Sequence, residues 1–197
     1  MMTKNKTARI IAALAAMTLL LLSAAGCVAG GGGNTAATSA TAVPGGTGLL
    51  SSFTAKDLDG STVDQTVLAG KKLNVINVWA TFCGPCIREM PELASVSSDY
   101  AEKGVQIVGV VVDAVDGNWR PIEENVSEAK AIVSETASPY THLIPSKELS
   151  AVCGVQYVPT TFFVDAEGRE VAPAVVGSRS EAEWASLIDE LLEGLGE

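Results

Sequence analysis

Short apolar runs alternate along the chain with segments whose apolar residues recur at helical spacing. Residues 73–80 (LNVINVWA) and 106–113 (QIVGVVVD) are rich in Val and Ile, which is typical of strands buried on both faces of a sheet. Residues 87–102 and 121–136 repeat their apolar side chains every three or four positions, which predicts helices. Buried strands separated by helices indicate an α/β protein in which these two strands run parallel.

Two hairpins flank this central unit. Residues 51–72 carry a turn signal between two short apolar stretches, which predicts an N-terminal β-hairpin. Residues 161–164 and 170–172 predict a second hairpin, joined by an Asp-Ala-Glu-Gly turn. Ser146 is a plausible N-cap for a short helix ending near Cys153.

The last helix has clear signals at both of its ends. Ser180 followed three residues later by Glu183 forms a capping box, and Gly194 is expected to end the helix. The whole order, β-α-β-α-β-β-α, predicts a central sheet of four or more strands with helices on both faces.

Two cysteines stand at the boundary between the first buried strand and the helix after it. Cys83 and Cys86 are separated only by Gly-Pro. A cysteine near a helix N-terminus meets free N–H groups and the positive end of the helix dipole, which favour the thiolate and lower the pKa. Cys83 is therefore the candidate nucleophile, and Cys86 is the candidate resolving thiol that releases a mixed disulfide.

The motifs around these cysteines resemble the thioredoxin superfamily, and more closely its membrane-tethered TlpA/ResA-like branch. The resemblance rests on Trp79-Ala80, on Cys83-Gly84-Pro85-Cys86, on EMPEL at 89–93 and on VPTTFF at 158–163, and it covers residues 51–193. It implies a thioredoxin-like fold with a mixed sheet, in which residues 51–72 are an N-terminal β-hairpin extension and residues 121–136 belong to a helix insertion.

The resemblance also implies where a substrate binds. The Val158-Pro159 bond is expected to be cis and to face the cysteine pair, so that Val158 pairs with an extended substrate segment. The expected substrate-binding residues are Trp79, Phe82, Gly84, Pro85, Val158 and Pro159. Phe82 stands where the family usually has a second tryptophan.

A proton acceptor for Cys86 is not evident at the position where thioredoxins carry one. Asn77 stands where they have a buried aspartate, and an amide cannot accept that proton. Glu89 lies three residues after Cys86 on the same side of a helix, at a position where the branch carries a glutamate. Glu89 is therefore the expected acid–base residue, with an exposed ion-paired glutamate as the alternative; Glu92 is expected to be solvated and dispensable.

The N-terminal residues read as a targeting signal. Residues 1–26 combine three basic residues, an apolar run and small residues immediately before Cys27, which resembles a lipoprotein signal peptide. Lipidation of Cys27 would anchor the chain to a membrane. An ordinary signal peptide with an incidental cysteine is the alternative. Residues 27–50 are expected to be a lipidated cysteine and a flexible Gly/Ala/Thr/Ser tether, followed by a thioredoxin-like domain over 51–197.

The charge of the chain argues against nucleic acid as a partner. Three of the 13 basic residues precede Cys27, so processing there leaves 10 basic against 23 acidic residues, a net charge of −13. Such a surface repels phosphate backbones. His142 is the single histidine, and its spacing to Cys153 fits no paired zinc-ligand pattern. We expect no cofactor and no metal, with Cys153 as a buried small apolar side chain or, alternatively, a third redox thiol.

These expectations combine into one functional hypothesis and two alternatives. The hypothesis is a lipid-anchored, monomeric thiol–disulfide oxidoreductase on the extracytoplasmic face of a bacterial cell membrane. It would reduce disulfides in exported proteins, including apocytochrome c, with electrons from a membrane donor. The alternatives are a copper-binding lipoprotein of related fold and a thiol peroxidase. Both fit less well, because the cysteine spacing and the residues before Cys83 lack the patterns that those proteins need.

Overall fold

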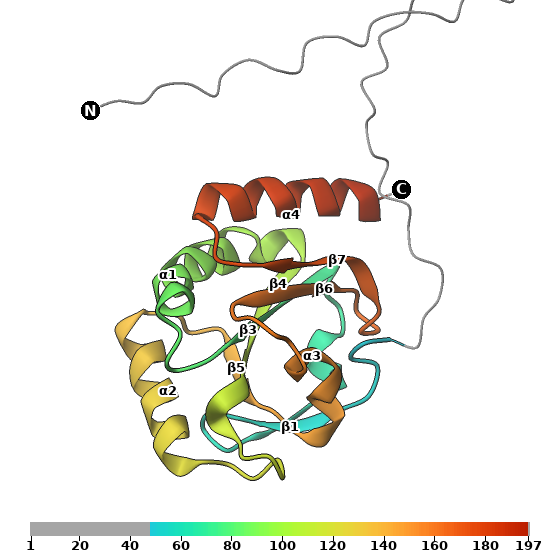
Figure 1. Cartoon of the computed structure of the whole chain (residues 1–197). Helices are drawn as coiled ribbons and strands as arrows, with labels where there is room; N and C mark the ends of the chain where they lie inside the picture. The colour runs from blue at the N-terminus through green and yellow to red at the C-terminus, as the bar shows by residue number, and fades with distance from the viewer. Residues whose placement is uncertain (1–47, 197) are drawn as a thin grey trace, which may run out of the picture. The chain divides into compact units, whose positions relative to one another are not determined.

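The computed structural model describes residues 48–196, through which one seven-stranded mixed sheet runs in the order β2-β1-β5-β4-β3-β6-β7 (Figure 1). The strands are β1 (Thr54–Asp57), β2 (Thr62–Asp64), β3 (Leu73–Trp79), β4 (Val105–Val111), β5 (Thr141–Ile144), β6 (Thr160–Val164) and β7 (Glu170–Val176). The α-helices are α1 (Gly84–Asp99), α2 (Glu123–Glu135), α3 (Ser150–Cys153) and α4 (Glu181–Leu195). The predicted signal peptide, Cys27 and most of the predicted tether lie outside the described residues.

The two strands predicted from continuous apolar runs form the middle of the sheet. β3 and β4 are parallel, as predicted, and every residue of β3 is buried. β6 pairs antiparallel on the other side of β3, and β7 completes the predicted C-terminal hairpin. Strands buried on both faces need apolar side chains at every position, which explains the uninterrupted Val/Ile/Leu pattern.

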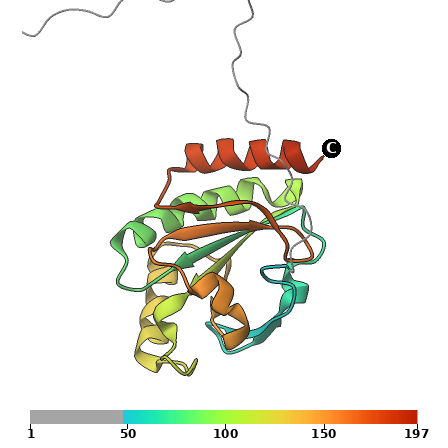
Figure 2. The same cartoon turned by 45° about the vertical axis from the view of Figure 1, so that its right-hand side comes forward.

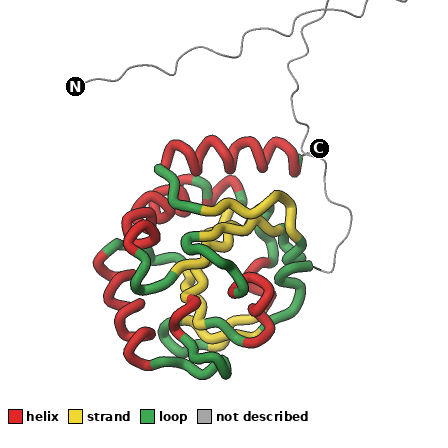
Figure 3. Tube along the Cα trace, viewed as in Figure 1, coloured by secondary structure: helices red, strands yellow, loops and turns green. Residues whose placement is uncertain are grey.

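Helices cover both faces of the sheet, as the sequence predicted (Figures 1 and 2). Alternate side chains of β3 point to opposite faces. Leu73 and Val75 share a core cluster with residues of α1 and α4, whereas Ile76 and Val78 pack with α3 and the N-terminal segment. α2 packs beside α1 in a cluster that includes Trp79 and the cysteine pair. Strands therefore run through the middle of the domain, between the helices (Figure 3).

One strand was not predicted. β5 pairs parallel with β4 on one side and antiparallel with β1 on the other, so it joins the N-terminal hairpin to the main sheet. It has four residues, THLI, and includes His142. A segment so short has little local strand signal, and its strand character comes from pairing with neighbours on both sides.

Several predicted boundaries shift by a few residues. α1 begins at Gly84 instead of residue 87, because Cys83 already serves as its N-cap. α2 begins at Glu123, since Pro121 forms an isolated bridge with Val115 before the helix. The capping box at Ser180 is confirmed, but α4 continues through Gly194.

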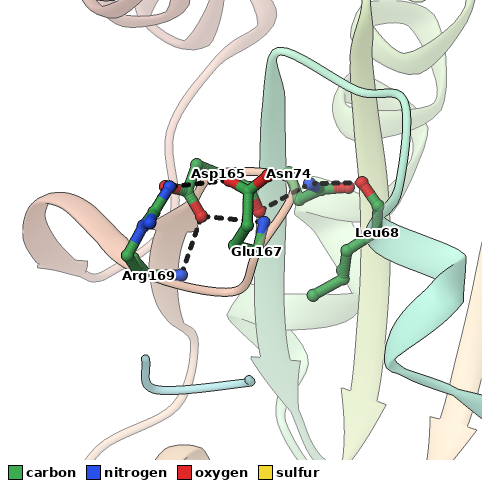
Figure 4. Close-up of polar contacts among 5 residues, drawn as sticks. All are labelled: Leu68, Asn74, Asp165, Glu167 and Arg169. Carbon is green, nitrogen blue, oxygen red and sulfur yellow. Dashed lines mark hydrogen bonds and ion pairs between the residues drawn. The ribbon is translucent and has the colours of Figure 1, made fainter. Parts of the chain in front are cut away.

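At the end of the sheet farthest from the cysteines, one buried side-chain amide connects β3 to two other segments. Asn74, at the start of β3, donates from Nδ2 to the carbonyl oxygens of Leu68 and Asp165, both at 3.2 Å (Figure 4). Asp165 in turn binds Arg169 across the β6–β7 turn. The chain joins the domain at this same end, because the N–H of Leu50 donates to Gly168 at 2.9 Å. Leu50 is buried in the core, so the folded domain begins before residue 51, where the tether was expected to end.

Candidate active site

The site begins with the cysteine that caps α1. The backbone of Cys83 is extended, and its sulfur accepts a hydrogen bond from the N–H of Cys86 at 3.2 Å. That N–H is one of the unpaired donors of the first helical turn. When the pair is reduced, the same donor and the helix dipole favour a thiolate on Cys83.

Cys86 lies in the first turn of α1 and forms a disulfide with Cys83. Their Cα atoms are 5.3 Å apart, which is an ordinary separation for a disulfide. Both cysteines are buried, Cys83 at 5% and Cys86 at 1% exposed.

The loop before β6 faces the disulfide. The Val158–Pro159 bond is cis, as predicted. The sulfur of Cys83 lies 3.6 Å from the carbonyl oxygen of Val158, which places the loop against the site. The β7–α4 loop lies beside it, because the N–H of Gly177 donates to the carbonyl of Pro159 at 2.9 Å.

The loop that carries Cys83 is held by an aspartate that the sequence analysis did not single out. Asp113 follows the end of β4 and accepts the N–H of Thr81 at 3.0 Å and its hydroxyl at 2.6 Å. Asn125 of α2 donates to the carbonyl of Asp113 at 2.6 Å. The carboxyl ends of neighbouring parallel strands meet at one edge of a sheet, so the position of Asp113 directly after a buried strand was the available signal.

Glu89 is a buried carboxylate held by three donors. Its Oε1 accepts the backbone N–H of Arg179 at 2.7 Å and the indole N–H of Trp184 at 2.9 Å, and its Oε2 lies 3.4 Å from the Asn77 amide nitrogen. Burial raises the pKa of Glu89, and the three hydrogen bonds together with the Arg179 charge oppose that rise. The exposed, ion-paired alternative is wrong, since Glu89 is only 2% exposed.

Two further expectations about polar residues near Glu89 have different outcomes. Asn77 is a buried, hydrogen-bonded residue as expected, because its amide also donates to Thr161 at 3.1 Å. Glu92 is not simply solvated. Its carboxylate accepts the N–H of Glu181 at 2.9 Å and so ties α1 to the N-terminus of α4.

Trp79 lies beneath the site and is completely buried, so its side chain is not exposed to a substrate. Its indole N–H donates to Nδ1 of His142 at 3.2 Å, and Nε2 of His142 lies 3.1 Å from the carbonyl of Ser138. The histidine is therefore neutral, with its proton on Nε2, and burial lowers its pKa to about 4. Gly109 provides the space, because a Cβ there would lie 2.2 Å from Nδ1.

The remaining predicted contact residues lie around the disulfide with different exposures. Phe82 and Pro85 are exposed, Gly84 and Val158 are partly exposed, and Pro159 is buried. The guanidinium of Arg88 lies close to Gly84, because a Cβ added to Gly84 would be 3.3 Å from Nη1 of Arg88.

The third candidate thiol, Cys153, does not lie in the cluster that contains the redox pair. Cys153 is the last residue of α3 and packs, partly buried, against the core cluster that contains Leu149 and Val152. Burial raises the pKa of its thiol to about 12. Across residues 48–196, no three His, Cys, Asp or Glu side chains come together as a metal site would require. In the same range, no helix has the length and apolar character to span a bilayer.

A disulfide at the N-terminus of α1, opposite a cis-proline loop in a thioredoxin fold, defines a thiol–disulfide oxidoreductase. The Redoxin family model matches residues 37–188, and the chain belongs to that family. Its relatives place it in the TlpA/ResA-like branch of the thioredoxin superfamily.

Three comparisons illustrate the relationship. The thiol:disulfide interchange protein HelX of Rhodobacter capsulatus is 34% identical over 125 residues, which span 62% of each protein. The thiol-disulfide oxidoreductase ResA of Halalkalibacterium halodurans is 27% identical over 146 residues, 72% of each. The crystal structure of a thiol:disulfide interchange protein from Chlorobium tepidum has a TM-score of 0.58 at 27% identity and covers 72% of this chain and 93% of its own.

Proposed function

We propose that the chain is a membrane-anchored, extracytoplasmic thiol–disulfide oxidoreductase that reduces disulfides in exported proteins. The observation that carries this proposal is the placement of Cys83. Its sulfur accepts a first-turn N–H of α1 and lies 3.6 Å from the carbonyl of the cis-proline loop. The first-turn N–H would stabilise a nucleophile that lies directly against the loop with which a substrate backbone is proposed to pair.

The reaction moves two electrons from the reduced cysteine pair to a substrate disulfide. The Cys83 thiolate attacks one substrate sulfur, forms a mixed disulfide and releases the other substrate sulfur as a thiolate. Cys86 then attacks the sulfur of Cys83, which forms the internal disulfide and releases the second substrate thiol. A dithiol donor at the membrane must supply two electrons to reduce the pair again.

Glu89 is the proposed acceptor for the proton of Cys86. It lies one helical turn beyond Cys86 on the same side of α1, and it is buried beside Asn77, which cannot accept a proton. Burial raises the pKa of Glu89 towards the range in which a carboxylate accepts a thiol proton efficiently. Proton transfer proceeds directly or through one water.

Substrate contacts are proposed for the residues that remain accessible around the disulfide. Val158 would pair with an extended substrate segment, and Phe82, Gly84 and Pro85 would contact its side chains. Pro159 is buried and would act by holding Val158 in place. Trp79 would not contact the substrate. Its buried side chain would support the end of β3, which leads to Cys83. Apocytochrome c is the substrate that the family resemblance suggests.

Anchoring through a lipid on Cys27 is the proposed reason why the protein stays at the membrane. Replacing Cys27 with Ala should release the protein from the membrane fraction or leave its signal uncleaved. A Cys27→Ala variant that is processed and membrane-bound like the parent would contradict the anchor but not the redox activity.

Insulin reduction tests the proposed activity. With dithiothreitol as electron source, the parent should accelerate insulin precipitation, and Cys83→Ser should lose that acceleration. Cys153→Ser is the matched control, because it removes a thiol that lies in a different cluster, and it should behave as the parent does. Full activity in Cys83→Ser would refute the proposal.

A further inference from the structure

The two oxygens of the Glu89 carboxylate have different surroundings. Oε1 accepts two hydrogen bonds, from the backbone N–H of Arg179 at 2.7 Å and from the indole N–H of Trp184 at 2.9 Å. Within the described residues, Oε2 has one long contact, 3.4 Å from the amide nitrogen of Asn77. That amide also donates to the hydroxyl of Thr161 at 3.1 Å. An oxygen of a carboxylate has about two lone pairs, so both are used on Oε1 while Oε2 can still accept.

Trp184 is fixed in its orientation by the packing of α4. Its side chain is completely buried, and its ring lies 6.4 Å from the ring of Phe163 in β6. Its backbone N–H donates to the carbonyl of Ser180, the residue that caps the helix. α4 lies beside α1 on one side of the sheet (Figures 1 and 2). The helix as a whole therefore directs the indole N–H at Glu89.

A second carboxylate of α1 holds the start of α4 in place. Glu92, one helical turn after Glu89, accepts the backbone N–H of Glu181 at 2.9 Å. The guanidinium carbon of Arg179 lies 5.3 Å from the centroid of the Trp184 ring. The first residues of α4 are thus bound to α1 at two successive turns, which fixes the distance between the indole and the carboxylate of Glu89.

This arrangement determines which oxygen of Glu89 can take a proton. A proton on Oε1 would displace one of its two donors, because it would occupy a lone pair that a donor now uses. A proton on Oε2 leaves both donors in place, since Oε1 then accepts them as a carbonyl oxygen. The carboxyl group can therefore gain and lose a proton without turning, and a preorganised group of this kind needs no rearrangement during the reaction.

We propose that Trp184 is a positioning residue for the resolving step, because its indole N–H leaves Oε2 as the oxygen of Glu89 that takes the proton of Cys86. This inference rests on the proposed role of Glu89 and adds the group that sets its geometry. As the Cys86 sulfur attacks the sulfur of Cys83, its proton passes to Oε2, directly or through one water. The substrate sulfur leaves with the electron pair of the broken disulfide bond.

The indole N–H also affects the pH at which Glu89 ionises. Burial is the largest influence on the pKa of Glu89 and raises it, whereas the hydrogen bond from Trp184 is one of those that lower it. A donor of this kind favours the charged carboxylate over the neutral acid. Loss of the N–H should therefore raise the pKa further, so that a smaller fraction of Glu89 is ionised at any pH near the midpoint.

The charged and ionisable groups around Glu89 do not obscure its titration. Arg179 carries a permanent positive charge. Tyr140 stays neutral, because burial and then the charge of Glu89 raise its pKa. His142 lies behind Tyr140, with ring centroids 4.4 Å apart, and burial lowers its pKa to about 4. His142 is therefore neutral where a carboxyl group with a raised pKa titrates, and the oxidised cysteine pair has no thiol to ionise.

An NMR titration of the full-length oxidised protein tests the inference. The carboxyl carbon signal of Glu89 is identified by its absence in Glu89→Gln. In the first variant, Trp184 is replaced by benzothienylalanine, which keeps the shape of the indole with sulfur in place of the N–H; Trp184→Phe is the second. Both should move the midpoint of Glu89 to higher pH. Trp119→Phe is the matched control, because Trp119 lies in the loop between β4 and α2, and it should keep the parent midpoint.

The pH profile of mixed-disulfide resolution is the second measurement. Below the parent midpoint, the two Trp184 variants should resolve the mixed disulfide about tenfold more slowly, since a hydrogen bond to a charged group is lost. The difference should shrink as the pH rises, because Glu89 then becomes ionised in every variant that retains it. A purely structural role of Trp184 would instead slow resolution by the same factor at every pH.

The possible outcomes separate the inference from the role of Glu89 on which it rests. An unchanged midpoint in the benzothienylalanine variant, or slowing by one factor at every pH, would overturn the inference while slow resolution in Glu89→Gln would still support Glu89 as proton acceptor. An equal shift in Trp119→Phe would also overturn the inference. Parent rates in Glu89→Gln would overturn the proposed role of Glu89 itself.

Discussion

At the scale of single residues, Glu89 shows how the surroundings set the behaviour of a carboxylate. Burial disfavours its charge, while donors from the β7–α4 loop, from Trp184 and from Asn77 favour it. The net effect is a raised pKa. Trp184 and the N–H of Arg179 are positioning groups that the sequence did not reveal, because they come from a segment 90 or more residues away.

Replacing Glu89 with Gln tests its role as proton acceptor. Resolution of the mixed disulfide should slow about tenfold or more, which corresponds to roughly 1.4 kcal/mol of barrier. In the parent, the rate should rise with pH as Glu89 loses its proton, with a midpoint above the ordinary carboxyl value of 4.5, because burial raises the pKa. Glu89→Gln should lack this rise, since the amide does not ionise.

Glu92→Gln is the control for that measurement. Its amide oxygen can still accept the N–H of Glu181, so the contact between α1 and α4 is retained. The parent rate and pH dependence should persist. Equal rates in both variants and the parent would end the proposal for Glu89.

At the scale of elements, the strand ends near the site depend on one glycine. Gly109 in β4 is paired with His142 in β5, whose ring occupies the space above it. The ring in turn accepts the hydrogen bond of Trp79 at the end of β3. Side chains of β3 and β5 thus meet across the intervening strand β4, just before the chain turns towards Cys83.

Gly109→Ala should destabilise the fold by about 3 kcal/mol, from overpacking and from loss of the Trp79–His142 hydrogen bond. The added Cβ would lie 2.2 Å from Nδ1 of His142, so the ring has to move. Urea unfolding measures the effect. Gly117→Ala is the matched control, because nothing lies within 4 Å of its added Cβ, and a comparable loss in that variant would contradict the explanation.

The sequence predicted those elements whose signals are local. The cysteine pair between a buried strand and a helix, the cis Val158–Pro159 bond and the Ser180–Glu183 capping box depend on neighbouring residues or on a family motif, and the structure has all three. β5 was missed because its four residues carry almost no strand pattern, and its register comes from β1 and β4.

Site residues supplied by distant segments were also missed. Asp113, Trp184 and His142 reach the site region through tertiary contacts with residues 32, 95 and 63 positions away in the sequence. Contacts of this kind depend on the folded arrangement of the chain, and the pattern of a single sequence does not reveal them.

At the scale of the whole molecule, the domain has two functionally different ends. β3 runs from Asn74, beside the β6–β7 turn, towards Cys83, and β6 runs back antiparallel. The first described residues join the domain at that turn through the Leu50–Gly168 hydrogen bond. Under the proposed anchoring, the disulfide therefore lies at the end of the domain opposite the point where the N-terminal segment leaves it.

The most direct test of the whole account is the capture of mixed disulfides in single-cysteine variants of the redox pair. Reduced Cys86→Ser should accumulate covalent adducts with disulfide-containing substrates, because Cys83 can attack but nothing resolves the product. Mass spectrometry of the adducts should place the bond on Cys83, and Cys83→Ser should form few or none. Adducts that accumulate in Cys83→Ser and not in Cys86→Ser would contradict the account.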